Sequence, residues 1–237
     1  MGHVHLYVAD PDVQKKLWVD VLGGQITHSG TLELLKFPGI MVVVAKARNP
    51  TTGGSDGSTV NHFGFLVKSY ADTKAKLTAA APDLKFAMDR PENKQMIARF
   101  PDGINVEFTE DANLKVPIAF HHIHEVATDP EAMRAWYAKA FGAKAGKRGE
   151  FMAAMVPGGE VDFRKVDTAG APTKGRSLDH IGFEVTNLEA FCKKLEAEGV
   201  TFDTTYRVVP QLDNLKIAYV LDPMGTRIEL TEGFASK

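Results

Sequence analysis

The stretch His122-Ile-His-Glu-Val-Ala-Thr-Asp-Pro-Glu131 repeats an earlier one, His3-Val-His-Leu-Tyr-Val-Ala-Asp-Pro-Asp12, at an offset of 119 residues. Two further pairs follow in the same order. Asn-His-Phe-Gly-Phe-Leu-Val around His62 matches Asp-His-Ile-Gly-Phe-Glu-Val around His180, at an offset of 118, and the strand-like ends at Glu107 and Glu229 match at an offset of 122. Three matches in one order at a nearly constant offset indicate a duplicated domain.

Each half contains a second, shorter repeat. His3 and His62 are 59 positions apart, and His122 and His180 are 58 apart, so the chain divides into four modules. Each module opens with alternating apolar residues, which is typical of a half-buried strand. A helix and about three further strand-like runs follow. We expect helices over 10–23, 69–81, 129–142 and 187–199, because capping residues, apolar stripes, and glycine or proline stops bound these segments.

The repeat predicts an α+β protein made of two tandem domains, 1–112 and 118–233, with four βαβββ modules in curved mixed sheets around a metal-binding concavity. The linker 111–117 joins the halves. Two polar, glycine-rich loops, 48–59 and 168–176, join the modules within each half.

Composition excludes several function classes. The 237 residues are 44% hydrophobic and 24% charged, and the net charge of −2 gives no reason to expect a nucleic acid or an anionic membrane as partner. The longest apolar run, Ile40–Ala45, is too short to cross a bilayer. We expect a monomer or homodimer that binds a small molecule. The single Cys192 and the absence of a signal segment favour a cytoplasmic location, although a secretion signal already removed would leave the same sequence.

Seven of the eight histidines lie on the opening strands of modules. They are His3, His5, His62, His121, His122, His124 and His180. Each half then offers histidines on two opening strands and a glutamate, Glu107 or Glu229, on its final strand. Two imidazoles and one carboxylate form a site for a first-row divalent metal with open coordination positions. A single strand histidine is more often a hydrogen-bonded core residue, but the repetition of the whole set favours metal binding.

These motifs resemble the vicinal oxygen chelate superfamily, which includes glyoxalase I, methylmalonyl-CoA epimerase, fosfomycin and bleomycin resistance proteins, and extradiol dioxygenases. The resemblance rests on the opening His-apolar-x-apolar-x-Val-x-Asp pattern, on the closing Asp-Pro-x-Gly-x-x-Ile-Glu-Leu pattern and on the four-module plan. It implies metal ligands at His122, His180 and Glu229 in the second half, and at His3, His62 and Glu107 in the first. Which modules pair to build a site is left open.

The superfamily's enzymes differ in a fourth ligand. Extradiol dioxygenases use three protein ligands around Fe(II), whereas glyoxalase I and the epimerase add one from the last strand of the preceding module. Asp162 falls at that position in the second half, and Val43, which cannot bind a metal, falls there in the first. We therefore expect the more complete site in the second half.

The expected function is that of a metal-dependent lyase or isomerase of the glyoxalase type, which chelates two adjacent oxygens of a small substrate and stabilises an enediolate-like intermediate. Each site would hold one divalent ion, Fe2+, Ni2+, Zn2+ or Mn2+. His124, Tyr219 and Glu229 are the candidate catalytic residues, and His121 is a candidate substrate contact. The resemblance leaves two alternatives open, an Fe(II) extradiol dioxygenase and a resistance-type protein that sequesters a small molecule. Lys147-Arg148 and Lys174 with Arg176 are candidate partners for glutathione carboxylates.

Overall fold

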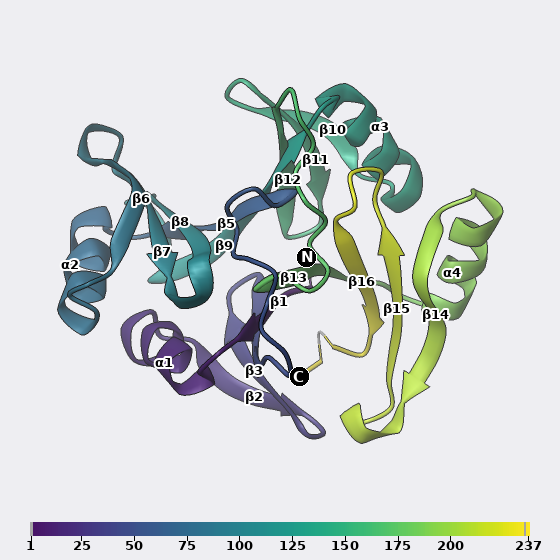
Figure 1. Ribbon diagram of the computed structural model, residues 1–237, viewed down its shortest axis with the longest axis horizontal. Helices are drawn as coiled ribbons and strands as arrows, with labels where there is room; N and C mark the ends of the chain where they lie inside the picture. Colours follow the sequence, from purple (N-terminus) through teal and green to yellow (C-terminus); the bar gives the residue numbers. More distant parts are fainter. Residues whose placement is uncertain (1, 235) are drawn as a thin grey trace.

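The computed structural model describes residues 2–234 and 236–237, which contain four copies of the strand–helix–three-strand module (Figure 1). The first comprises β1 (His3–Val8), α1 (Pro11–Lys15), the π-helical η1 (Lys16–Val21), β2 (Gln25–Ser29), β3 (Leu32–Phe37) and β4 (Ile40–Lys46). The second comprises β5 (Val60–Val67), α2 (Tyr70–Ala80), β6 (Lys85–Arg90), β7 (Gln95–Phe100) and β8 (Ile104–Glu110), with short 3-10 turns η2 (Pro91–Asn93) and η3 (Pro101–Gly103).

The second half repeats this plan. The third module comprises β9 (Ile118–Ala127), α3 (Pro130–Phe141), β10 (Lys144–Arg148), β11 (Phe151–Val156) and β12 (Gly159–Lys165). The fourth comprises β13 (Leu178–Glu184), α4 (Leu188–Ala197), β14 (Thr201–Val209), the 3-10 turn η4 (Pro210–Leu212), β15 (Leu215–Leu221) and β16 (Arg227–Glu232). The α+β class and the four modules predicted from the repeat are therefore confirmed.

The helices lie where their capping residues predict them. The Asp129 side chain accepts a hydrogen bond from the backbone of Ala132, and Gly142 ends α3 in the left-handed region at φ +67°. The first helix differs from the expectation, because residues 16–21 form a π-helical turn that an apolar stripe does not distinguish from an α-helix. Within the described residues, no helix has the length and apolar character needed to span a bilayer.

The modules pair across the two halves of the sequence. One eight-stranded sheet has the order β14-β15-β16-β13-β1-β4-β3-β2 and joins module four to module one. The other has the order β10-β11-β12-β9-β5-β8-β7-β6 and joins module three to module two. Antiparallel pairs β1–β13 and β5–β9 form the two junctions. The sheets therefore do not follow the expected division into residues 1–112 and 118–233.

Aromatic packing between the helices and the strands of neighbouring modules does follow that division. Trp18 of module one contacts Phe63 and Phe100 of module two, with ring centroids 5.8 and 4.8 Å apart. In the second half Phe141 of module three lies 5.1 Å from Phe183 of module four. The backbone thus joins modules one with four and two with three, whereas the aromatic core joins one with two and three with four. Each half depends on the other for both of its central strand pairs.

We predict that neither half folds alone when the chain is cut within residues 111–117. Fragment 1–112 exposes the edges of β1 and β5, and fragment 118–237 exposes those of β9 and β13, so each presents two unpaired apolar strands. Mixing the fragments after co-refolding should restore the circular dichroism and elution volume of the intact chain. A monomeric 1–112 fragment with a cooperative thermal transition would contradict this pairing.

A buried acid pair connects the two sheets. The Tyr137 hydroxyl lies 2.9 Å from Glu125 of β9 and 3.5 Å from Asp222, which follows β15. Asp222 also accepts hydrogen bonds from the backbone of Met224 and Thr226, at 2.9 and 2.8 Å. Burial and the neighbouring Asp222 carboxylate raise the pKa of Glu125 well above its ordinary value, and burial raises the pKa of Asp222 to about 6. Glu125 therefore keeps its proton to a higher pH than an ordinary glutamate.

This raised pKa predicts how stability depends on pH. A carboxyl group whose folded pKa exceeds its unfolded pKa stabilises the fold fully below the unfolded value, and this contribution is lost as pH rises through the folded value. Glu125→Gln, which cannot ionise, should therefore gain free energy of unfolding relative to the native chain as pH rises above about 4.5. Urea denaturation between pH 4 and 9 measures this difference. The exposed Glu150→Gln is the control and should show a flat difference.

Candidate metal centre

Two glycines allow an imidazole to lie across the junction of each sheet. His3 pairs with Gly182, and Gly182 pairs in turn with Glu229. A Cβ atom on Gly182 would lie between 2.1 and 2.7 Å from atoms of the His3 ring. Only glycine leaves this space free, so His3 reaches over β13 to Glu229 on the next strand, β16. Gly64 permits the same crossing in the other sheet, between His122 and Glu107.

His3, His180 and Glu229 converge at the first junction, which we call the open site. Nε2 of His3 lies 2.8 Å from Oε2 of Glu229, and Nε2 of His180 lies 3.0 Å from the same oxygen. One donor atom from each residue lies within 4.8 Å of the other two, and all three side chains are buried. Two imidazole nitrogens and a carboxylate oxygen on one point match the donor set of a divalent-metal site.

Asp179 orients the His180 ring. The ring donates from Nδ1 to Asp179 at 2.7 Å, leaving Nε2 directed at Glu229. Asp179 also accepts from Arg227 at 2.9 Å and from the backbone of Gly175 at 2.6 Å. Burial opposes its ionisation, but hydrogen bonds, first from His180, hold the pKa of Asp179 below its ordinary value. A carboxylate behind a histidine is the usual support of a metal ligand.

The two carboxylates also act on the protonation of the site. Burial opposes the charged form of His180, but hydrogen bonds to Asp179 and Glu229 raise its pKa. Burial likewise opposes ionisation of Glu229, whereas hydrogen bonds from His180 and His3 hold its pKa well below the ordinary value. Glu229 is therefore ionised at neutral pH, as a ligand of a cation must be.

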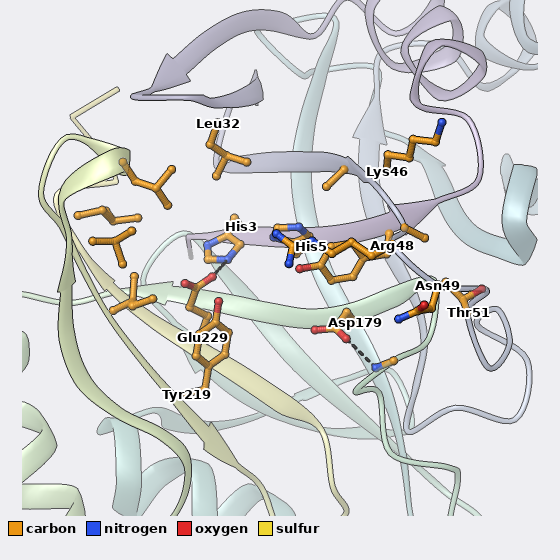
Figure 2. Close-up of a pocket in the computed structure, with 18 of the residues that line it drawn as sticks. His3, His5, Leu32, Lys46, Arg48, Asn49, Thr51, Asp179, Tyr219 and Glu229 are labelled. Atoms are coloured by element: carbon orange, nitrogen blue, oxygen red, sulfur yellow. Dashed lines mark hydrogen bonds and ion pairs between the residues drawn. The ribbon is translucent and has the colours of Figure 1, made fainter.

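A cavity of about 790 Å³ opens onto this site. His3, His5, Leu32, Tyr219 and Glu229 all line it, and Figure 2 shows the two histidines between Leu32 on one side and Glu229 with Tyr219 on the other. His5 has no hydrogen-bond partner for its buried Nε2 among the described residues, and its ring lies 4.6 Å from that of His180. Burial and then His180 keep the pKa of His5 well below the ordinary value, so its ring is neutral.

Tyr219 completes one wall of the open site. Its ring lies 5.2 Å from His180, and the Arg227 guanidinium lies 3.9 Å above its face. Burial and the Glu229 carboxylate raise the pKa of Tyr219, so that the hydroxyl keeps its proton. Tyr219 can therefore donate a hydrogen bond to a group bound beside Glu229.

The second junction gathers His62, His122, His124 and Glu107. Nε2 of His62 lies 3.0 Å from Oε2 of Glu107 and 3.3 Å from Nε2 of His122. The His124 ring stacks on that of His62 at 4.6 Å. Gln95 donates to the other oxygen of Glu107, Oε1, at 2.9 Å, so both carboxylate oxygens have partners.

Arg148 enters this second cluster from the end of β10. Its Nε donates a short hydrogen bond to Asp162 and lies 3.4 Å from Glu160, and its Nη1 lies 3.7 Å from Glu107. Asp162 is fully buried, and burial raises its pKa to about 7 although Arg148 opposes this shift. His121 lies at the margin, 3.9 Å from Glu160. We call this cluster the arginine site.

The structure groups the predicted ligands differently from the expectation. The proposed set in the second half is divided, because His122 and Asp162 lie in one sheet and His180 and Glu229 in the other. The first-half set is divided in the same way: His3 joins the open site, and His62 and Glu107 join the arginine site. Of the candidate catalytic residues, Tyr219 lies with Glu229, whereas His124 lies at the arginine site. The exchange of strands between halves is the cause.

Sequence reasoning missed several residues that shape these sites. Asp179, Gly182 and Gly64 are not among the residues predicted from the sequence, and His5 is predicted only as one of the seven opening-strand histidines. The signal was present in the repeat, because Asn61-His-Phe-Gly64 and Asp179-His-Ile-Gly182 both place glycine two residues after the histidine. Both also place a side-chain oxygen acceptor directly before it, and Asn61 accepts from His62 at 2.8 Å.

Comparisons with known proteins agree with this architecture. Residues 119–230 match the family model of the Glyoxalase/Bleomycin resistance protein/Dioxygenase superfamily. Glyoxalase I from Zea mays is similar in structure, with a TM-score of 0.72 and 17% identity over 97% of this chain and 91% of that one. A putative dioxygenase from Bacillus subtilis gives a TM-score of 0.69 and 17% identity, over 98% of this chain and 86% of that one. No sequence among the curated proteins matches the chain.

The family match over residues 119–230 confirms the resemblance to the vicinal oxygen chelate superfamily that the sequence motifs indicate, and the fold of the chain agrees with it. At 17% identity, the two structural neighbours establish the fold alone. Reaction type and metal depend on the site itself.

We predict that Gly182→Ala disrupts the open site. The added methyl group would overlap the His3 ring in a packed strand, which should lower the free energy of unfolding by about 1–3 kcal/mol. It should also weaken Co2+ binding, because His3 can no longer reach Glu229. Urea denaturation and cobalt titration measure the two effects. The control is Gly146→Ala, where the close contacts of the new methyl group are with the flexible Met155 side chain and the nearest backbone atom, the Ala153 carbonyl oxygen, lies 3.8 Å away. Unchanged stability and cobalt affinity in Gly182→Ala would contradict the crossing.

Proposed function

We propose that this protein is an Fe(II)-dependent dioxygenase of the extradiol type that binds the two adjacent oxygens of a small substrate at the open site. The number of metal ligands that the open site offers supports this function. His3, His180 and Glu229 supply three ligands, and Val43 occupies the position of the fourth. Two histidines and one carboxylate with open positions are the set used by non-haem Fe(II) oxygenases.

The surroundings of Val43 support three ligands rather than four. Val43 is buried in an apolar cluster that also contains Leu34, Ile217 and Phe234. A glyoxalase-type isomerase would require an oxygen or nitrogen donor on this strand. The lyase or isomerase function expected from the sequence depends on Asp162 as the fourth ligand, and Asp162 belongs to the other sheet.

The residues of the open site fit a divalent cation. The two Nε2 atoms directed at one carboxylate oxygen provide the donors, and Asp179 fixes the His180 ring. When bound, the cation supplies positive charge that stabilises the anionic form of the two substrate oxygens and orients them.

Protein groups around the donors would bind and orient the substrate. The Tyr219 hydroxyl, which keeps its proton, donates a hydrogen bond to a substrate oxygen beside Glu229. The neutral His5 ring offers its unpartnered Nε2 to a substrate hydroxyl group. His5 thus takes the place that the sequence assigned to His124. The apolar wall of Leu32, Leu215 and Phe234 suits an aromatic body and excludes water from it.

Three of the four basic residues considered for glutathione carboxylates have other partners. Arg148 lies within the arginine site. Arg176 donates to the backbone carbonyl oxygens of Gly54 and Asp56, and Lys174 pairs with Asp203. These contacts weigh against a glutathione-dependent reaction.

Iron loading and oxygen uptake test the proposal. Protein loaded anaerobically with Fe(II) should retain close to one equivalent of iron and consume oxygen when catechols are added. His180→Ala combined with Glu229→Ala should lose both properties, because two of three ligands are removed. The matched control combines the equivalent substitutions His62→Ala and Glu107→Ala in the other sheet, which should leave iron at the open site and oxygen uptake in place.

Three outcomes would overturn the assignment. Iron retention by the His180→Ala, Glu229→Ala variant would show that the metal binds elsewhere. Nickel- or zinc-dependent isomerisation of a hemithioacetal without oxygen uptake would restore the isomerase reading. Tight binding of a small molecule by metal-free protein, with no turnover, would favour a sequestering protein.

A further inference from the structure

The arginine site carries two carboxylates that the open site lacks. Glu160 and Asp162 occupy on β12 the positions that Met41 and Val43 occupy on β4, because both strands pair in parallel with a histidine-bearing strand in the same register. With Glu107, the arginine site therefore gathers three acidic side chains beside its histidines. All three are buried, and buried carboxylates need compensating positive charge.

Arg148 supplies that charge. Its guanidinium lies within 4 Å of Asp162, Glu160 and Glu107. The corresponding place at the end of β2 belongs to Ser29, whose hydroxyl donates to the backbone of Leu212 instead. A planar guanidinium among three carboxylates makes the contacts that a metal ion would make there.

Two buried atoms at the arginine site have no hydrogen-bond partner among the described residues, Nδ1 of His124 and Oδ1 of Asp162. Oδ1 of Asp162 is buried and accepts no hydrogen bond from any described residue, whereas Oδ2 binds Arg148. The His62 and His122 rings lie beside Glu107, so removing the guanidinium would leave two imidazoles and at least two carboxylates facing one space. This set contains the donors of a divalent-metal site.

We propose that Arg148 fills the cation position of the arginine site, so that the folded chain binds one divalent ion, at the open site, and accepts a second only when this guanidinium is removed. This inference rests on the proposed function, because the single ion of the native chain is the one bound at the open site. The duplicated protein is therefore asymmetric. The open site is adapted to hold an exchangeable metal ion, whereas the arginine site holds the permanent positive charge of Arg148.

Metal stoichiometry tests the proposal without any measurement of activity. After equilibrium dialysis against Co2+ and elemental analysis, the native chain should hold one equivalent and Arg148→Met two. The second equivalent should disappear when His62→Ala is added to Arg148→Met. The control Arg134→Met changes an arginine of the same module that pairs with Glu131, and it should hold one.

Stability provides a second readout. Metal-free Arg148→Met should unfold at a lower temperature than the native chain, because three carboxylates lose their cation, and Co2+ should raise its melting temperature by more than it raises that of the native chain. Arg148→Gln, which keeps a hydrogen-bond donor for Asp162, is measured in parallel and carries the same stoichiometric expectation if Arg148→Met does not fold.

The outcomes separate this inference from the proposed function. Two equivalents in the native chain, or one in both folded Arg148 variants, would overturn the role of Arg148 and leave the open site unaffected. No metal in the native chain but one equivalent in Arg148→Met would overturn the proposed function and support the role of Arg148.

Discussion

The arrangement of both sites depends on one steric condition: an imidazole must cross a neighbouring strand at a glycine. His3 crosses β13 at Gly182 to reach Glu229, and His122 crosses β5 at Gly64 to reach Glu107. A Cβ atom at either glycine would occupy the space of the ring. Because the candidate ligands lie on three adjacent strands, they converge only if the middle strand carries no side chain where the imidazole crosses it.

The same junctions explain why the halves of this protein are interdependent. Backbone pairing joins module one to four and two to three, whereas aromatic packing joins one to two and three to four. No module thus has all of its partners in its own half. Each cluster of candidate ligands consequently draws on both halves, as His3 with Glu229 illustrates, and the two tandem halves are interlocked.

Duplication has left two geometrically related sites with different electrostatics. The open site has apolar neighbours at Met41 and Val43 and a cavity in front of it, whereas the arginine site has Glu160 and Asp162 and a guanidinium among them. Similar ligands therefore do not imply the same chemistry. Positive charge compensates the acids at the arginine site from within the chain, and the open site keeps its donors accessible from the cavity.

The sequence by itself determined most of the helices and strands and which histidines and acidic residues are the candidate ligands. Local signals sufficed, because capping at Asp129 and the alternation around His3 are properties of short segments. It did not determine which of these residues lie together, since strand pairing between segments far apart in the chain leaves no local pattern. Asp162 illustrates the difference: its position on β12 followed from the repeat, but Arg148 and the exchange of modules, which decide its role, appear only when the sheets assemble.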